Sequence, residues 1–290
     1  MNDYIFATDV STDITPELAA KYDLHFVPMS YMVGEEENVC TTLEKDEKLK
    51  YFYDAQRQGK ETHTSQITPT RYVEYFSTFL AKGIDVIYVC LSSGLSNTCS
   101  SAMVAKNELD DKYPDATLYV IDSLAATGGM GLLLELAAKN KENGMTASEN
   151  ASWMNENAVK LAHWFVVEDL MYLKRGGRLS ATTAVVGTAL NIKPILEIDP
   201  EGKLITIEKK RGTKAALRYM VDRYFQTRDE SFEKIVYIVH ADAKESAEML
   251  QSMISEKDPE VQFRVTYLCP IIGAHTGPGM AAVIHMGQRK

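Results

Sequence analysis

The sequence predicts an α/β protein built from two domains. Through the first half of the chain, short runs of β-branched and aromatic residues alternate with longer helical patterns, which is typical of a parallel sheet flanked by helices. The second half carries a hairpin signal between two strand-like runs, which indicates a mixed sheet. The length of 290 residues fits two domains of about 150 residues each. We expect an N-terminal domain over residues 1–160, with a mainly parallel sheet flanked by helices, and an α+β domain over residues 161–290.

The first domain is expected to contain four strands, at residues 4–10, 24–29, 85–93 and 117–123. Two helices are expected to begin at Pro16 and Pro69, because each proline follows a threonine that can cap the helix. Another helix is expected to run from near Leu124 to the Asn143-Gly144 pair. Residues 31–62 are acidic and then amphipathic, and they interrupt the alternation of strands and helices, so we expect a lid-like insertion there.

The second domain is expected to begin near residue 160, after a helical stretch at 147–161. A strand is predicted at 163–170, and a glycine-bearing turn follows at 174–180. Strands at 195–199 and 203–210 flank Pro200-Glu201-Gly202, which indicates a hairpin. The rest of the chain is expected to form a helix at 213–227, a strand at 234–242, a helix at 243–254 and a strand at 261–269.

The composition excludes several classes of protein. Hydrophobic residues make up 45% and charged residues 24%, which excludes collagen-like and disordered chains. With 31 Lys and Arg against 40 Asp and Glu, the formal net charge is −9 and the isoelectric point about 5.3, which argues against extended contact with nucleic acid or an anionic bilayer. Since no apolar run approaches the ~18 residues of a transmembrane helix, we expect no stable membrane insertion.

The four cysteines, Cys40, Cys90, Cys99 and Cys269, show neither CxxC spacing nor a crowded framework. Their spacing therefore predicts no zinc site and no disulfide scaffold. Free thiols fit a reducing compartment, and Asp3 stands where a signal peptide would carry positive charge. We expect a cytoplasmic protein with no metal and no cofactor.

Four segments combine glycines with hydroxyls or a histidine near the ends of expected strands, where ligands bind in open α/β sheets. They are residues 63–66 (HTSQ), 92–98 (SSGLSNT), 174–178 (KRGGR) and 273–279 (GAHTGPG).

Two of these segments carry hydroxyl groups, and each has a functional and a structural interpretation. Residues 92–98, with Ser93 and Ser96, follow a strand and open a helix, so they form a cup for an anion or simply cap the helix. Thr64 and Ser65 face the same crevice or form a hydrogen-bonded turn.

The other two segments carry a histidine and a group of cations. The glycines around His275 hold an imidazole in a defined orientation beside a ligand, or place a histidine in a turn. The cations of residues 174–178 offer a fork for an acidic group or a phosphate, or are solvated turn residues.

Motifs of common catalytic sites are missing from the sequence. No Walker A or GxGxxG pattern follows the first strand, HExxH is absent, and Ser93 lacks the GxSxG context of an activated serine. Gly128, Gly129 and Gly131 lie in a helical pattern, which favours close helix packing over phosphate binding.

Motifs spread over nearly the whole chain resemble those of the DegV family in order and approximate spacing. They are ATDVSTDIT (7–15), HTSQITP (63–69), LSSGLSNT (91–98), VIDS (120–123), FVVEDLMYLKRGGRLS (165–180), NIKPIL (191–196) and GAHTGPG (273–279). The GGR and His-Thr-Gly-Pro-Gly blocks are individually unusual, which makes the resemblance specific. Two loops depart from the family pattern: Thr-Ser-Gln-Pro is Thr-Ser-Gln-Ile here, and Ser-Gly-Thr is Ser-Asn-Thr.

The resemblance implies a two-domain α/β protein that binds one long-chain fatty acid, palmitate-like or oleate-like, in a tunnel between the domains. The FakB members of the family present the carboxylate of that fatty acid to a fatty acid kinase, which forms the acyl phosphate. The chain would then be a lipid-transport carrier in fatty acid metabolism, with the kinase as its partner, and not an enzyme.

The resemblance also assigns roles to residues at matching positions. Thr64, Ser96 and His275 match the residues that bind the carboxylate, and neither loop departure removes these donors. Arg178 and Arg211 match supporting cations or kinase contacts. Supporting or partner-docking roles are further expected for Ser65, Ser93, Thr276 and Gly277.

Other functions stay open at this point. One alternative is an enzyme, either a small acyl hydrolase or a phosphoryl-transfer protein that uses His275 as its nucleophile. Another is a regulatory module that senses lipid without passing it on. The sequence does not separate a carrier from a sensor.

Overall fold

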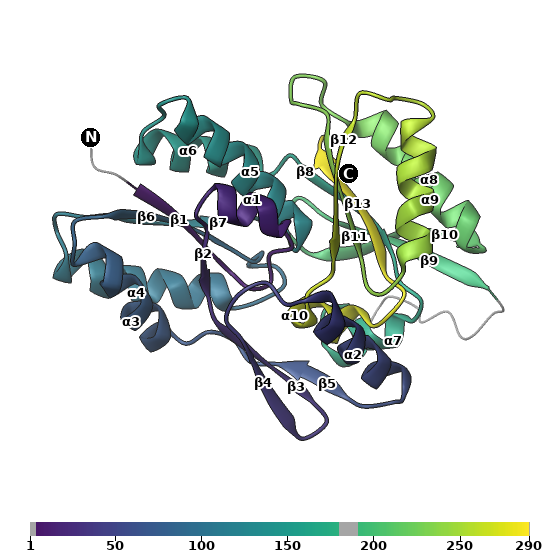
Figure 1. Cartoon of the computed structure of the whole chain (residues 1–290), viewed down its shortest axis with the longest axis horizontal. Helices are drawn as coiled ribbons and strands as arrows, with labels where there is room; N and C mark the ends of the chain where they lie inside the picture. Colours follow the sequence, from purple (N-terminus) through teal and green to yellow (C-terminus); the bar gives the residue numbers. More distant parts are fainter. Residues whose placement is uncertain (1–3, 180–190, 290) are drawn as a thin grey trace.

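The structure is a computed structural model, and it describes residues 4–179 and 191–289. It consists of a four-stranded sheet, a six-stranded sheet and a small three-stranded sheet, with helices around them (Figure 1). This arrangement confirms the predicted α/β fold with a parallel sheet and a second, mixed sheet. Among the described residues, no helix has the length and apolar character needed to cross a membrane.

The four-stranded sheet is entirely parallel, with the strand order β2-β1-β6-β7. Its strands are β1 (Tyr4–Asp9), β2 (His25–Val27), β6 (Asp85–Cys90) and β7 (Leu118–Asp122). One face is covered by α3 (Pro69–Leu80) and α4 (Thr98–Lys112), and the other by α5 (Gly128–Glu142) and α6 (Ala147–Ala158). Burial on both faces explains why β1 and β6 are continuous apolar runs in the sequence.

Two of the predicted helix starts are confirmed by their caps. Thr15 and Thr68 cap α1 (Pro16–Lys21) and α3, and each hydroxyl accepts a main-chain N–H of the first turn. The helix expected from near Leu124 begins only at Gly128. Leu124 and Thr127 have positive φ angles of 47° and 52°, which a right-handed helix cannot contain, so the start predicted from the apolar pattern is wrong.

The segment expected as an insertion contains its own sheet and helix. Strand β3 (Met29–Val33) pairs antiparallel with β4 (Glu36–Cys40) and β5 (Thr62–Thr64), and α2 (Asp46–Arg57) connects the last two. The Tyr53 hydroxyl donates to Leu268 O (2.8 Å), and Gln56 Nε2 donates to Gly273 O (3.0 Å). These bonds fix α2 to the C-terminal part of the chain.

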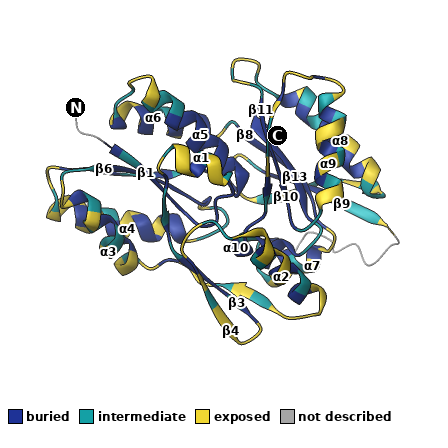
Figure 2. Ribbon diagram, viewed as in Figure 1, coloured by how far each residue is buried: buried dark blue, intermediate teal, exposed yellow. Residues whose placement is uncertain are grey.

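The six-stranded sheet has the order β10-β9-β8-β13-β11-β12, in which only β11 and β12 pair in parallel. Its strands are β8 (Leu161–Val166), β9 (Ile192–Ile198), β10 (Leu204–Arg211), β11 (Ile235–His240), β12 (Gln262–Tyr267) and β13 (Ala281–Met286). Helices α8 (Thr213–Thr227) and α9 (Lys244–Ser255) cover its outer face, and α5 packs on its inner face. Helix α5 therefore lies between the two large sheets and is buried from Gly128 to Ala138 (Figure 2).

Two short helices differ from the expected secondary structure. The strand predicted at 163–170 ends at Val166, because Asp169 caps α7 (Leu170–Arg175) and its carboxylate accepts the Met171 N–H at 2.8 Å. Consequently Lys174 and Arg175 lie on the last turn of that helix and only the glycines after them form the turn. The glycine-rich segment at 273–279 likewise begins inside α10 (Pro270–Thr276), which places His275 on a helix.

Candidate functional site

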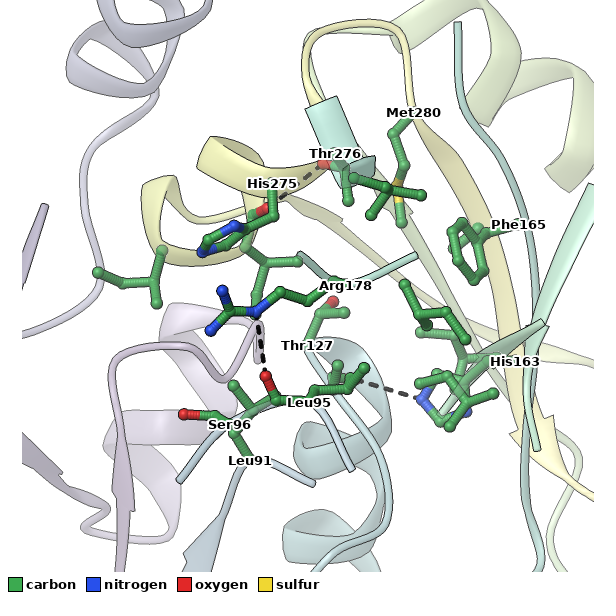
Figure 3. A pocket seen from close by; sticks show the side chains of 18 residues that line it. Leu91, Leu95, Ser96, Thr127, His163, Phe165, Arg178, His275, Thr276 and Met280 are labelled. Atoms are coloured by element: carbon green, nitrogen blue, oxygen red, sulfur yellow. Dashed lines mark hydrogen bonds between the residues drawn. The ribbon is translucent and has the colours of Figure 1, made fainter. Parts of the chain in front are cut away.

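A pocket lies between the inner face of the six-stranded sheet and the carboxyl edge of the parallel sheet. It encloses about 690 Å³ of space between atoms, part of it open to solvent. It is lined by Leu91, Leu95, Ser96, Ala126, Thr127, His163, Phe165, Leu173, Arg178, Ile198, Leu204, Ile271, Ile272, His275, Thr276, Met280, Ala282 and Ile284. Most of these side chains are apolar, and three of the polar ones, Ser96, Arg178 and His275, lie on one side of the pocket, which we call its polar end (Figure 3).

The apolar wall is one face of the six-stranded sheet. Phe165 on β8 lies opposite Ala282 on β13, and Ile284 follows two residues along the same strand. Because alternate residues of a strand point to the same face, all three line the pocket. The intervening Trp164 and Val283 belong to the separate core beneath α8 and α9.

At the polar end of the pocket, the lining residue His275 contacts Thr64, which is not itself among the lining residues. Thr64 is the last residue of β5 and His275 lies on the last turn of α10, and Thr64 Oγ1 lies 2.9 Å from His275 Nε2. Burial and the nearby charge of Arg178 lower the pKa of His275 to about 4, so the imidazole is neutral at pH 7. In the tautomer that carries the proton on Nε2, the ring donates to Thr64 and leaves the Thr64 hydroxyl proton available to a ligand oxygen.

Ser96 approaches the same end from the loop before α4, and its hydroxyl lies 2.6 Å from that of Thr98. Figure 3 shows Ser96 and His275 on the same side of the pocket, with Arg178 between them. The main-chain N–H groups of Leu95 and Ser96 both bond to Ser92 O. These two N–H groups are therefore not free to bind an anion, and the prediction of an anion cup is wrong at these positions. The loop offers side-chain hydroxyls instead.

Arg178 brings a positive charge to the polar end. Its Nε donates to Leu95 O at 3.1 Å, and its guanidinium also bonds to Gly176 O. These bonds hold the half-buried cation between the Ser96 loop and the end of α7, and burial lowers the pKa of Arg178. Among the described residues that line the pocket, Arg178 is the one that carries a full charge at neutral pH, because burial lowers the pKa of both histidines.

Other residues named from the sequence lie around this end or away from it. Ser65 and Ser93 are exposed beside it, while Thr276 is buried in the pocket lining. Gly277 has a φ of 74° and ends α10, and an added Cβ would lie 2.5 Å from the Tyr172 ring, so the fold requires glycine at this position. Arg211 is exposed at the far end of β10, on the order of 20 Å along the strand from the pocket, and does not join the cluster.

Sequence reasoning missed Thr127 and His163 as pocket residues. Thr127 has a φ of 52°, which is strained for a β-branched residue, and its hydroxyl accepts the Gly128 N–H. His163 lies across the pocket, where burial lowers its pKa to about 3. The glycines at the start of α5 were the sequence signal for this contact. An added Cβ at Gly129 would lie 2.1 Å from His163 Nε2, which confirms the predicted close helix packing and identifies His163 as the packing partner.

Comparisons with known proteins find relatives that span nearly the whole chain. The family model described as "Uncharacterised protein, DegV family" matches residues 6–287. A DegV domain-containing protein of Clostridium perfringens is 35% identical over 290 residues, which cover 100% of this chain and 99% of the relative. A DegV lipid-binding protein of Thermotoga maritima superposes with a TM-score of 0.83 at 26% identity, covering 99% of this chain and 100% of that one. A DegV family protein of Ruminococcus gnavus, solved with vaccenic acid, gives a TM-score of 0.86 at 25% identity over 98% and 99% of the two chains.

Proposed function

This chain belongs to the DegV family, and we propose that it binds one long-chain fatty acid, palmitate-like or oleate-like, in the pocket between its two large sheets. The observation that carries the proposal is the division of the pocket into an apolar sheet face and a polar end with hydroxyls and a cation. The Thermotoga maritima relative is a lipid-binding protein and the Ruminococcus gnavus relative holds vaccenic acid, which supports the same ligand class here.

The two parts of the pocket meet the two demands of a fatty acid. Burying about fourteen methylenes at ~0.8 kcal/mol each contributes on the order of 11 kcal/mol before the costs of association. A carboxylate that leaves water needs hydrogen-bond donors and a balancing charge. The hydroxyls of Thr64 and Ser96 supply donors, and Arg178 supplies the charge.

We further propose that the chain is a carrier that presents the carboxylate to a partner fatty acid kinase. The polar end borders exposed residues, among them Ser65, Ser93, Lys174 and Arg175, so a kinase can bring the γ-phosphate of its nucleotide close to the head group. Lys174 and Arg175 lie on the last turn of α7, where they form a basic surface for an acidic face of the kinase.

The arrangement around His275 gives no support to the hydrolase or phosphoryl-transfer alternative. A catalytic histidine is normally oriented by a third group that bonds its second nitrogen. His275 Nδ1 is buried with no hydrogen-bond partner among residues 4–179 and 191–289, and an added Cβ at Gly176 would lie only 2.4 Å from it.

Mass spectrometry of organic extracts from the purified protein tests fatty acid binding. Thr64→Ala, Ser96→Ala and His275→Ala variants, each shown to be folded by circular dichroism, are compared with the native chain. Ser100→Ala is the matched control, because this serine is exposed on α4 away from the pocket lining. We expect a stoichiometric long-chain fatty acid in the native protein and the control, and depletion in the three variants. An empty native protein that also refuses added oleate and palmitate would exclude the proposal.

Presentation to a kinase is tested separately, with loaded protein, a fatty acid kinase and ATP. The double variant Lys174→Glu and Arg175→Glu should lose most acyl-phosphate formation while it retains its fatty acid. Lys244→Glu is the control, because Lys244 is an exposed lysine at the start of α9, on the outer face of the mixed sheet. Unchanged acyl-phosphate formation by the double variant would contradict docking through α7.

A further inference from the structure

Two thiols and a carboxylate meet directly beneath the Ser96 loop. Cys90 ends β6, Cys99 lies in the first turn of α4, and Asp122 ends β7. Their sulfur atoms and a carboxylate oxygen all lie within 4.8 Å of one another. Cys40 and Cys269 are also buried, but neither belongs to such a group within the described part of the chain.

We propose that Cys90, Cys99 and Asp122 bind a zinc ion. Thiolates and carboxylates are both common zinc ligands, and two thiolates favour zinc over magnesium or calcium, which prefer oxygen. Three protein ligands leave the fourth tetrahedral position to a water molecule. This site does not depend on the proposed fatty acid function, and the cysteine spacing in the sequence gave no indication of it.

The surroundings of Asp122 prepare it to act as a ligand. Its Oδ1 accepts the main-chain N–H groups of Leu124 (3.0 Å) and Ser93 (3.2 Å). These bonds fix the plane of the carboxylate and leave its second oxygen available, which is the role that outer hydrogen bonds usually have at metal sites. Asp122 is half-buried and Ser93 is exposed, so the carboxylate side of the cluster borders solvent.

The charge balance favours metal binding at this buried position. Binding of Zn²⁺ forms two sulfur–zinc bonds and one oxygen–zinc bond, and it releases the two thiol protons to solvent. The two protons released match the two positive charges of the ion, so binding leaves the net charge of this buried site unchanged. Because the two thiols release their protons when they bind zinc, zinc affinity should rise with pH.

A zinc ion here would connect β6, β7 and the start of α4, the three elements around the loop that carries Ser96. An alternative is that Cys90 and Cys99 are ordinary small core residues, since free cysteines are often buried. The two interpretations differ in one measurable property, because only a metal site produces thiolate–metal bonds.

Absorption spectroscopy of the whole protein, with Co²⁺ as the probe, distinguishes a metal site from two ordinary core cysteines. The reduced, chelator-treated chain is titrated with Co²⁺ and then with Zn²⁺, and bound zinc is counted by native mass spectrometry. We expect one thiolate-to-cobalt charge-transfer band that saturates at one equivalent, bleaching by one Zn²⁺, and release of two protons per zinc, read with a pH indicator.

Variants locate the site and control for folding. Cys99→Ser removes one sulfur, and Asp122→Asn keeps an oxygen for the two main-chain N–H groups while it removes the charged ligand. Because each change removes a direct ligand, it should weaken zinc binding by more than the 10-fold to 100-fold, roughly, that the loss of an outer hydrogen-bond partner costs. Cys40→Ser is the matched control, a buried cysteine outside the cluster, and it should bind normally. Added Zn²⁺ should raise the melting temperature of the native chain and of Cys40→Ser, but not that of Asp122→Asn.

Two outcomes would overturn the proposal. One is the absence of a charge-transfer band from the folded native chain at one equivalent of Co²⁺. The other is a band of full strength in Cys99→Ser, which would place the metal elsewhere. Fatty acid content is measured in the same samples, so failure of the zinc site and failure of the proposed function are distinguishable.

Discussion

Replacement of Arg178 by glutamine tests whether the polar end of the pocket recognises a carboxylate. Glutamine keeps a donor that can reach Leu95 O but removes the positive charge that lies between His275 and Ser96. If the head group is a carboxylate beside this cation, the variant should bind fatty acids less tightly. In the proposed complex the apolar tail contacts the opposite sheet face, so its contribution should be unaffected.

The expected loss follows from the kind of bond removed. A hydrogen bond to a charged group contributes about 1.5–3 kcal/mol, which is about a 10-fold to 150-fold change in affinity. A fatty alcohol with the same tail has no charge to lose, so its affinity should fall by less than about 3-fold. Because the two ligands share a tail, the ratio of their affinities removes the tail contribution altogether.

The assay is a displacement titration with hexadecanoic acid and hexadecanol, each measured on delipidated native protein and on Arg178→Gln. Arg175→Gln is the control, because Arg175 is exposed and stacks on the Tyr172 ring at 4.6 Å. It should bind both ligands like the native chain. An equal loss of acid and alcohol binding in Arg178→Gln would show that Arg178 acts through loop structure and would refute the carboxylate assignment.

Two further predictions concern the tail and the acid stability of the fold. Phe165→Leu enlarges the apolar end of the pocket, so octadecanoic acid should gain affinity relative to hexadecanoic acid, by up to ~0.8 kcal/mol per additional methylene. The ratio of the two affinities is measured by displacement titration. A ratio that does not change in the variant would place the tail elsewhere. His285 accepts the Trp164 indole N–H (3.1 Å) and is neutral, and burial lowers its pKa from 6.5 to about 4. The unfolded state therefore takes up this proton first as the pH falls, and about 2 kcal/mol of stability is lost between pH 6.5 and pH 5. Urea denaturation should show a smaller loss in His285→Gln over this range, and equal losses would contradict the assignment.

The sequence predicted best those elements that are determined by local interactions. The prolines at Pro16 and Pro69 fix the start of their helices, and the threonine before each one caps it. The strands of the parallel sheet are buried on both faces, so their apolar runs were unambiguous. The hairpin around Pro200-Glu201-Gly202 was also correct, because turn residues carry their own signal.

The errors occurred where contacts distant in sequence decide the structure. The apolar pattern from Leu124 onward resembles a helix, but the chain bends through Leu124 and Thr127 before α5 can pack between the two sheets. The six-residue helix α7 is too short to show a helical period, and its cap Asp169 was read as part of a strand.

The candidate site could be predicted only in part for a similar reason. Thr64 and His275 are 211 residues apart, and their hydrogen bond depends on contact between β5 and α10. The family resemblance named both residues, but the properties of the residues alone left each with a purely structural alternative. The position of Arg178 at the polar end of the pocket follows only from the fold. The residues KRGGR by themselves do not distinguish Arg178 from the exposed Lys174 and Arg175.

The cysteine cluster shows most clearly what spacing rules overlook. Those rules detect ligands that one loop or one helix brings together, whereas Cys90, Cys99 and Asp122 come from three consecutive elements of an α/β unit. In such a unit, parallel strands end at the same edge and the following helix begins there, so residues 9 and 32 positions from Cys90 become its neighbours. The same geometry places Ser96 above the thiols, because the loop from β6 to α4 contains it. Ligand groups in parallel sheets are therefore better sought by comparing strand ends than by measuring spacing along the chain.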